Sequence, residues 1–191
     1  MTLSKRAMLA LTRALEDEYC AHAGPGVLVG SFQRVRFYRE SERRWRELAR
    51  TARVAVVFAD FPGPAAGEAG EGAPIRVPLP PDAPARREWT LVCDGPDYPA
   101  CLSGWEFPGQ RPRADADRRF EAVWSVDPRV VRDAAVICAQ LAGSARPGLV
   151  PLLRALPSEP PPPASADLRR AAGLLSRMTG YLEQAPGRPG P

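Results

Sequence analysis

Histidine is nearly absent from this chain of 191 residues, in which His22 is the single example. The four cysteines, Cys20, Cys93, Cys101 and Cys138, are far apart and form no C-x-x-C pair. Because structural zinc sites use closely spaced Cys and His ligands, the sequence predicts no zinc site. Without a secretory signal, such cysteines are typical of reduced thiols, and a redox role is left open only for Cys101, which lies near the candidate ligand site described below.

The sequence also lacks the short motifs that carry nucleotide and hydrolase chemistry. It contains neither a GxxxxGK[ST] phosphate loop nor a GxGxxG turn. Ser31 ends an apolar strand but lacks the second glycine of a GxSxG elbow. The acids Asp94, Asp97 and Glu106 show no pairing that would make them a general acid and base. We therefore expect a protein that is not an enzyme, and no motif names a cofactor; a hydrolase is the alternative that these absences argue against.

Long apolar runs and charge of one sign are missing as well. No stretch approaches the roughly 20 apolar residues of a membrane span, and the N-terminal segment is charged throughout, so we expect a soluble, cytoplasmic protein without membrane contact. The net charge is +4, but arginines alternate with acids in RESERRWRELAR at residues 39–50. This pattern is typical of a solvated helix face and argues against direct nucleic-acid binding.

What is present is a strong β-α-β pattern around residues 30–61. An apolar strand at Val27–Phe32 is followed by a helix from about Glu40 to Ala52 and a second strand at Arg53–Asp60. This length and order are typical of a right-handed crossover between parallel strands. The second strand is apolar at consecutive positions, which predicts a central strand covered on both faces.

The flanking segments complete the predicted fold. A helix is expected from Ser4 to about His22, and another after Asp127 and Pro128 up to Gly143. Between them, the strands Glu88–Cys93, Tyr98–Phe107 and Arg119–Val126 follow one another without a helix, as in an antiparallel meander. The sequence thus predicts an α/β (α+β) fold with a single central mixed sheet of about five strands, flanked by helices.

Proline and glycine divide the chain into segments. We expect one α/β domain at residues 1–146, which contains a mobile loop at about 62–74 and a short extended piece at Ile75–Leu79. A Pro-rich linker follows at 147–165, with one turn of helix at Pro147–Leu156. The chain then continues with an amphipathic helix at 166–185 and a disordered tail at 186–191.

Aromatic and polar side chains gather in the FQRVRFY segment that follows the first strand. Open α/β sheets place ligands at the carboxyl ends of their strands, so this segment predicts the wall of a ligand pocket. The alternative is that the rings only pack loops onto the sheet. The candidate pocket residues are Phe32, Gln33, Arg36, Phe37, Tyr38, Trp105 and Glu106.

The C-terminal helix carries apolar residues at alternating spacings of three and four. Leu168, Leu175, Met178 and Leu182 form its candidate partner or dimer surface. The pattern spans barely two heptads, so it predicts either a helix that docks back on the domain or one that binds a partner or a second copy.

Three segments resemble the DICT sensory domain, which is named for its presence in diguanylate cyclases and two-component systems. They are SFQRVRFYRESERRWRELARTARVAVVFADF at residues 31–61, REWTLVCDGPDYPACLSGWE at 87–106 and RFEAVWSVDPRVVRDAA at 119–135. The resemblance covers roughly residues 4–143 and depends on a pattern of aromatics, arginines and acids.

The resemblance implies a non-enzymatic bacterial input module that senses a signal and passes it to an output domain. No output domain is recognisable in this sequence, so we expect the signal to leave through a signalling or transcription-regulatory partner, or through a change in association such as homodimerisation. The hypothesis is a module that binds a small molecule or other signal and relays it by protein contacts. The alternative is a ligand-free adaptor or dimerisation protein that acts through the C-terminal helix.

Overall fold

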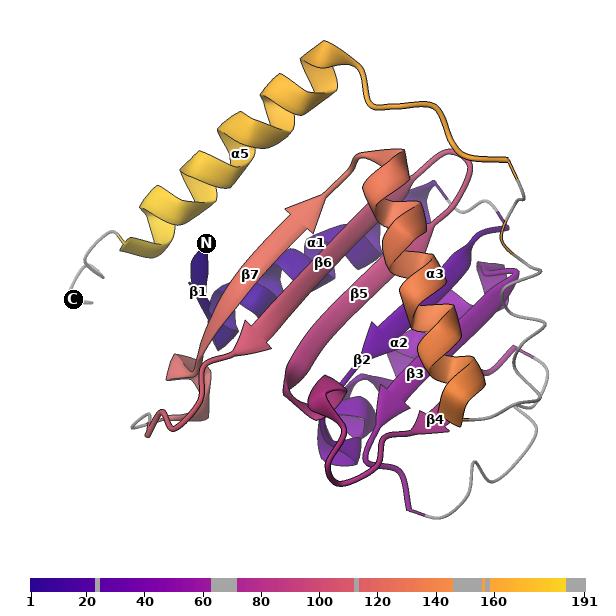
Figure 1. The fold of residues 1–191 in the computed structure, drawn as a ribbon, viewed down its shortest axis with the longest axis vertical. Coiled ribbons are helices and arrows are strands. Elements are labelled where there is room, and N and C mark those ends of the chain that lie inside the picture. Colours follow the sequence, from indigo (N-terminus) through magenta and orange to yellow (C-terminus); the bar gives the residue numbers. More distant parts are fainter. Residues whose placement is uncertain (23–24, 63–71, 112–113, 146–155, 157–158, 185–191) are drawn as a thin grey trace.

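An open mixed sheet of seven strands organises the chain (Figure 1). The computed structural model describes residues 1–22, 25–62, 72–111, 114–145, 156 and 159–184. Across the sheet the strand order is β1-β7-β6-β5-β2-β3-β4. The strands are β1 (Thr2–Ser4), β2 (Val27–Ser31), β3 (Val54–Ala59), β4 (Ile75–Pro78), β5 (Glu88–Asp94), β6 (Pro99–Glu106) and β7 (Arg119–Ser125).

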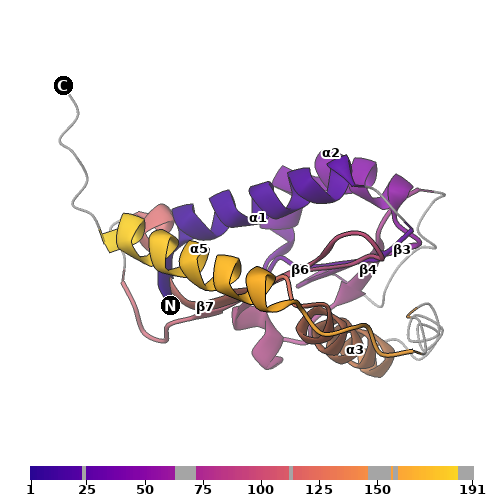
Figure 2. The ribbon, with the colours of Figure 1, turned by 90° about the horizontal axis from the view of Figure 1, so that it is seen from above.

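Helices cover the two faces of the sheet unequally. Helices α1 and α2 lie on one face and α3 lies on the other, while α5 runs along the edge formed by β1 (Figure 2). Two 3-10 turns, η1 and η2, precede β5 and β7. The helices and turns are α1 (Lys5–Ala21), α2 (Val35–Thr51), α3 (Pro128–Ala145), α5 (Ala166–Gln184), η1 (Pro84–Arg87) and η2 (Asp115–Asp117).

The predicted crossover is confirmed, because β2, α2 and β3 form a parallel β-α-β unit. Strand β3 alternates between the two cores: Ala55 and Val57 pack on the side of α1 and α2, whereas Val56 and Phe58 pack on the side of α3. Its run of consecutive apolar residues therefore indicates a strand buried on both faces, as expected. The meander β5-β6-β7 is also confirmed, and it joins the sheet beside β2.

The predicted α/β fold with a single central mixed sheet flanked by helices is confirmed, and two details of its elements differ from the prediction. The sheet has seven strands instead of about five, because β1 and β4 extend its edges with only three and four residues. Helix α2 begins at Val35, five residues before the predicted Glu40, so most of the FQRVRFY segment is helical. The carboxylate of Asp60, at the end of β3, accepts a hydrogen bond of 2.5 Å from the Val35 amide and so caps this helix.

The core on the side of α1 and α2 contains the largest buried side chains and one buried acid. The indole N–H of Trp45 donates a hydrogen bond of 3.1 Å to Glu16, which also pairs with Arg44. Burial raises the pKa of Glu16, and the hydrogen bonds and charge of Arg44 oppose that rise. The predicted core role of Trp45 is confirmed, since 1% of its surface is exposed.

Several predicted segments fall wholly or largely outside the described residues. These are most of the loop at 62–74, the turn at Pro147–Leu156, much of the linker at 147–165 and the tail at 186–191. Among the residues that are described, no helix is long and apolar enough to cross a membrane.

Candidate functional site

Polar side chains from distant parts of the chain meet where β2 and β6 end. The two strands run in the same direction, because both are antiparallel to β5, which lies between them. Gln33, just after β2, donates from Nε2 to Oε2 of Glu106 over 3.1 Å. Arg118 donates from Nη1 to Glu106 over 2.9 Å and to Oε1 of Gln33 over 3.4 Å. The predicted pair Gln33 and Glu106 is thus brought together by a third residue, Arg118.

Phe37 forms the apolar centre of this cluster. Its ring lies 4.2 Å from the Lys5 ammonium and 5.3 Å from the Arg118 guanidinium, and both cations also pair with Asp115. Burial would raise the pKa of Asp115, but the hydrogen bond from Lys5 and the charge of Arg118 lower it overall. The cluster of Lys5, Gln33, Phe37, Glu106 and Arg118 is called the hub below.

The hub is tightly interlocked. Gln33 is only 3% exposed and its φ of 60° lies in the left-handed region, which is uncommon for a residue other than glycine. Such backbone strain persists only where the surroundings hold it, here through the contacts of the side-chain amide with Glu106 and Arg118. The hub residues therefore bind one another, and their contacts hold the ends of β2 and β6 against the start of α1.

The other predicted pocket residues surround the hub. Phe32 packs edge-on against Tyr38 and Trp45, and so belongs to the core. Arg36 stacks its guanidinium 4.7 Å from the Phe37 ring. The Arg87 guanidinium lies 5.0 Å from the Trp105 ring and donates to the carbonyl of Glu106.

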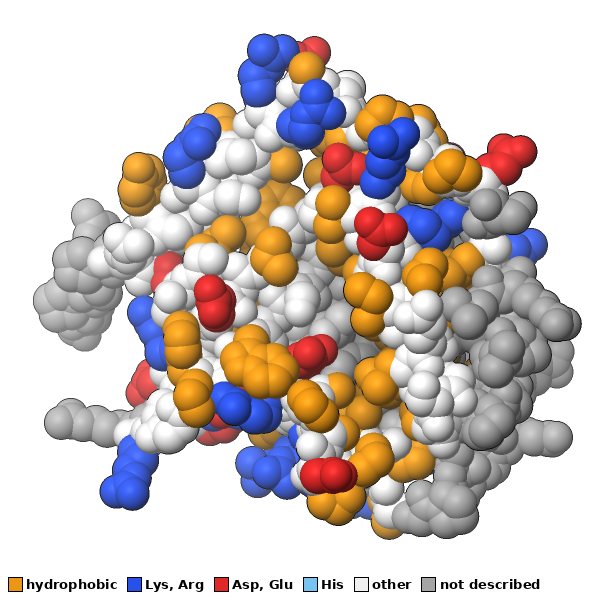
Figure 3. Space-filling view, in the orientation of Figure 1, with side chains coloured by type: hydrophobic (Ala, Val, Ile, Leu, Met, Phe, Trp, Pro, Cys, Tyr) orange, Lys and Arg blue, Asp and Glu red, His pale blue; other side chains and the backbone are white. Residues whose placement is uncertain are grey.

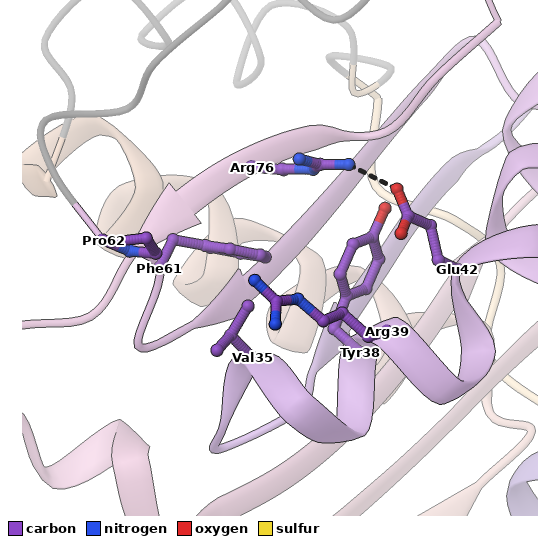
Figure 4. Close-up of a pocket in the computed structure, with 7 residues that line it drawn as sticks. All are labelled: Val35, Tyr38, Arg39, Glu42, Phe61, Pro62 and Arg76. Atoms are coloured by element: carbon purple, nitrogen blue, oxygen red, sulfur yellow. Dashed lines mark hydrogen bonds and ion pairs between the residues drawn. The ribbon is translucent and has the colours of Figure 1, made fainter.

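A pocket of about 250 Å³ opens beside the hub, on the other side of the first turns of α2 (Figure 4). It lies between α2, the end of β3 and β4. Of the predicted pocket residues, Tyr38 alone lines it. The lining residues are Val35, Tyr38, Arg39, Glu42, Phe61, Pro62 and Arg76.

Two arginines give the pocket its charge. Arg76 donates to Glu42 over 2.6 Å, and its guanidinium lies 5.3 Å from the Tyr38 ring and 5.9 Å from the Phe61 ring. Arg39 makes no hydrogen bond or ion pair with any residue that the structure describes. Figure 4 shows its guanidinium reaching toward Phe61 across the pocket. The pocket thus combines aromatic and aliphatic side chains with Arg39, a cation that has no counter-ion among the residues described.

Tyr38 is the buried polar group of this pocket. Its side chain is 1% exposed, and its hydroxyl makes no hydrogen bond within the described part of the chain. Burial raises the pKa of this hydroxyl, and the neighbouring Arg76 opposes part of the rise. A buried hydroxyl without a partner is rare in folded proteins, which makes this position a candidate for contact with a ligand.

Arg39, Glu42, Phe61 and Arg76 were missed by the sequence analysis. The arginine-rich run of α2 was interpreted only as a solvated face, and that interpretation holds for most of it. The missing information was that β4 lies beside β3, which brings Arg76 over the start of α2. The spacing of Val35, Tyr38, Arg39 and Glu42 on one helix face was the available signal.

The described residues contain no group of three or more His, Cys, Asp or Glu side chains that could hold a metal ion. All four cysteines are free. Burial raises the pKa of Cys101 to about 11, so its thiol stays protonated at neutral pH.

The sequence model of one protein family matches residues 1–106, more than half of the chain. The family is DICT, the sensory domain in diguanylate cyclases and two-component systems. The chain belongs to the DICT family. The match includes β1 to β6 with α1 and α2, and therefore the pocket and most of the hub. No curated protein and no solved structure is significantly similar to the chain.

The last helix, α5, lies beyond the part that matches the DICT family. Glu183 anchors it to the domain by accepting hydrogen bonds from the Ser4 amide over 2.9 Å and from Arg119 over 2.7 Å. The predicted partner surface faces away from the domain: Leu168, Leu175, Met178 and Leu182 are 39%, 51%, 48% and 74% exposed. The helix therefore docks through a side of small residues and Glu183, and leaves its larger apolar residues exposed.

Proposed function

We propose that this DICT domain is a non-enzymatic sensor that binds a small organic anion in the pocket between α2 and β4 and relays the binding through protein contacts. The observation that carries the proposal is Arg39, which has no counter-ion among the described residues, beside the buried Tyr38 hydroxyl in a pocket that combines polar and aromatic side chains. The DICT family supports sensing as the role. The ligand and the partner, a signalling or transcription-regulatory protein of a bacterial pathway such as a two-component system, are part of the proposal.

An anion suits the charges of the pocket. Glu42 already accepts hydrogen bonds from both Arg76 and Arg46, so the acid of the pocket is neutralised within the chain. Arg39 remains, and a carboxylate or phosphate is the group that a guanidinium binds best, through two parallel hydrogen bonds. A ring or short chain on the anion would pack between Phe61 and Val35. The ligand class is therefore a small anion with an apolar body.

The hub offers a route from the pocket to α5. Val35 and Tyr38 line the pocket, whereas Phe37, on the same turn of α2, contacts Lys5 and Arg118. The residues adjacent to these two cations, Ser4 and Arg119, are the ones that hold Glu183 of α5. If the first turn of α2 can shift, a ligand that binds one of its positions more tightly would favour that position. The shift would move Phe37 against Lys5 and Arg118 and so change how firmly α5 is held.

A thermal-shift screen tests the ligand class. The full chain is heated with a set of small carboxylates, each matched by its neutral amide, for example benzoate against benzamide. A carboxylate that binds the folded state raises Tm, and its amide does not. Arg39→Ala should abolish the shift, whereas Arg43→Ala, an exposed arginine of α2 outside the pocket lining, should keep it. Equal shifts by the amides, or a shift that survives Arg39→Ala, would reject the proposal.

A second candidate is the ligand-free adaptor, which the exposed apolar residues of α5 favour. It predicts that no compound of the screen shifts Tm. It also predicts that deletion of the chain after Pro157 removes self-association or partner binding and leaves Tm unchanged. The sensor predicts a ligand-dependent Tm shift that persists in this truncated chain.

A further inference from the structure

Helix α5 has an apolar seam that its own domain does not cover. The seam consists of Leu168, Leu174, Leu175, Met178, Tyr181 and Leu182, all of which are exposed. Their spacing of three and four places them on one side of the helix. The opposite side carries Ala172, Ser176, Thr179 and Glu183 and is the less exposed one. An exposed contiguous apolar surface of this kind marks an interaction site.

The face of the sheet on the side of α3 is likewise incompletely covered. Helix α3 packs over β5, β6, β2 and β4, and α5 contacts β1 at the far edge. Between the two helices Figure 3 shows hydrophobic and acidic side chains on the surface, together with basic ones toward one end. The Arg87 guanidinium lies 5.0 Å from the ring of Trp105. The outward-facing residues of this open strip are Glu88 of β5, Ser103 and Trp105 of β6, and Glu121 and Val123 of β7. Val123 is 63% exposed.

The two surfaces have complementary charges. Glu88 and Glu121 of the open strip make no side-chain hydrogen bond or ion pair with the residues described, and burial raises the pKa of Glu88. On α5, Arg170 and Arg177 border the apolar seam, one beside Leu174 and one beside Tyr181. Arg177 has no partner in the described chain, and Arg170 pairs only with Asp167 on its own helix. Unpaired acids on the sheet thus match arginines on the helix.

We infer that two copies form a two-fold symmetric dimer. The apolar seam of α5 from each copy packs on the open strip of the other copy. Each copy supplies both surfaces, as an isologous interface requires. Pairing of two seams with each other would instead bring Arg170 and Arg177 of both helices to one interface, where Asp167, which already pairs with Arg170, is the neighbouring acid. This inference concerns the oligomer and does not depend on the ligand pocket.

Sedimentation velocity on the full chain over a concentration series tests this dimer. The dimer should appear as concentration rises, and Met178→Asp on the seam or Val123→Asp on the strip should each raise the dimer Kd by about tenfold or more. Leu9→Asp, an exposed leucine of α1 on the opposite face of the sheet, should leave the Kd unchanged. Arg177→Glu is a second variant at the border of the seam, at an exposed position without a partner among the described residues, and should also raise the Kd. Circular dichroism checks that all four variants fold.

A mixture of the Met178→Asp and Val123→Asp variants distinguishes seam-on-strip from seam-to-seam pairing. A 1:1 mixture of Met178→Asp and Val123→Asp retains one intact interface, the seam of the Val123→Asp copy on the strip of the Met178→Asp copy. The mixture should therefore dimerise more tightly than either variant alone. Dimerisation that Val123→Asp does not affect would overturn the inference in favour of seam-to-seam pairing. A chain that is monomeric at every concentration, or a mixture no tighter than its components, would also overturn it.

Discussion

The Trp45 indole lies against Gly30 in the middle of β2, and this contact sets a steric limit at that residue. A Cβ atom added to Gly30 would lie 2.5 Å from the Trp45 ring, which the packed core holds in place. A Cβ added to Gly104 of β6 would also meet an atom at 2.5 Å, but that atom is the terminal methyl of Met8. A rigid ring cannot yield as a flexible side chain can.

Gly30→Ala and Gly104→Ala therefore form a matched pair. We expect Gly30→Ala to lower the free energy of unfolding by about 2–3 kcal/mol, and Gly104→Ala by less than about 1 kcal/mol. Urea titration followed by circular dichroism measures both. Equal losses in the two variants would show that Trp45 can move as easily as Met8.

Asp60 links the end of β3 to the start of α2 and to η1. It accepts from the Val35 amide and pairs with Arg86 over 2.9 Å. Burial alone would raise the pKa of Asp60, but the Val35 amide and the charges of Arg86 and Arg34 lower it overall. A carboxyl with a lowered pKa in the folded state stabilises the fold above its unfolded pKa, and this contribution disappears as the pH falls through the folded pKa.

Asp60→Asn should thus lower the free energy of unfolding by about 0.5–1 kcal/mol at pH 7, because the amide can still accept from Val35 but the charge that pairs with Arg86 and faces the N-terminus of α2 is lost. The difference from the wild type should shrink as the pH falls below about 4, where the carboxyl of the unfolded chain takes up a proton, and should disappear as the pH falls through the lowered pKa of the folded state. Urea titrations at pH 7 and at pH 3 measure it. A difference that is constant over this range would mean that the charge of Asp60 contributes nothing.

At the scale of elements, the helices and strands whose sequences have a strong apolar periodicity were predicted. Element boundaries that depend on residues far away in the chain were missed. The apolar repeat of α1 and the Asp127-Pro128 start of α3 are local signals, and both helices were predicted correctly. The start of α2 depends on Asp60, which lies 25 residues further along the chain. No local pattern reveals such a cap, so the first turn of α2 was taken for a loop.

Helix α5 is attached to the domain mainly through Glu183. Glu183→Gln removes the charge that Arg119 pairs with, and it weakens the hydrogen bond with the Ser4 amide. In the monomer, at concentrations below the dimer Kd, we expect hydrogen exchange in α5 to become faster by about tenfold, with exchange in β5 and β6 unchanged, because few other contacts within the chain hold this helix. Glu47→Gln, an exposed acid on α2, is the control. Equal protection of α5 in both variants would contradict the anchoring role of Glu183.

At the scale of the whole molecule, the sheet order explains why the candidate site was predicted only in part. The sequence placed the candidate site at the carboxyl end of β2, and Gln33 and Glu106 meet there. It did not indicate on which side of the crossover the meander lies, or that β4 pairs with β3. The hub and the pocket follow from those two placements: β6 brings Glu106 to Gln33, and β4 brings Arg76 to Tyr38.

The central claim is that ligand binding at the pocket changes how α5 is held. The most direct measurement is hydrogen exchange, followed by mass spectrometry, of the full chain with and without the carboxylate that gives the largest Tm shift. The account predicts slower exchange in the first turns of α2 and around Arg76, together with faster exchange in α5, and loss of both changes in Arg39→Ala. Protection at the pocket with unchanged exchange in α5, or protection elsewhere in the chain, would contradict it.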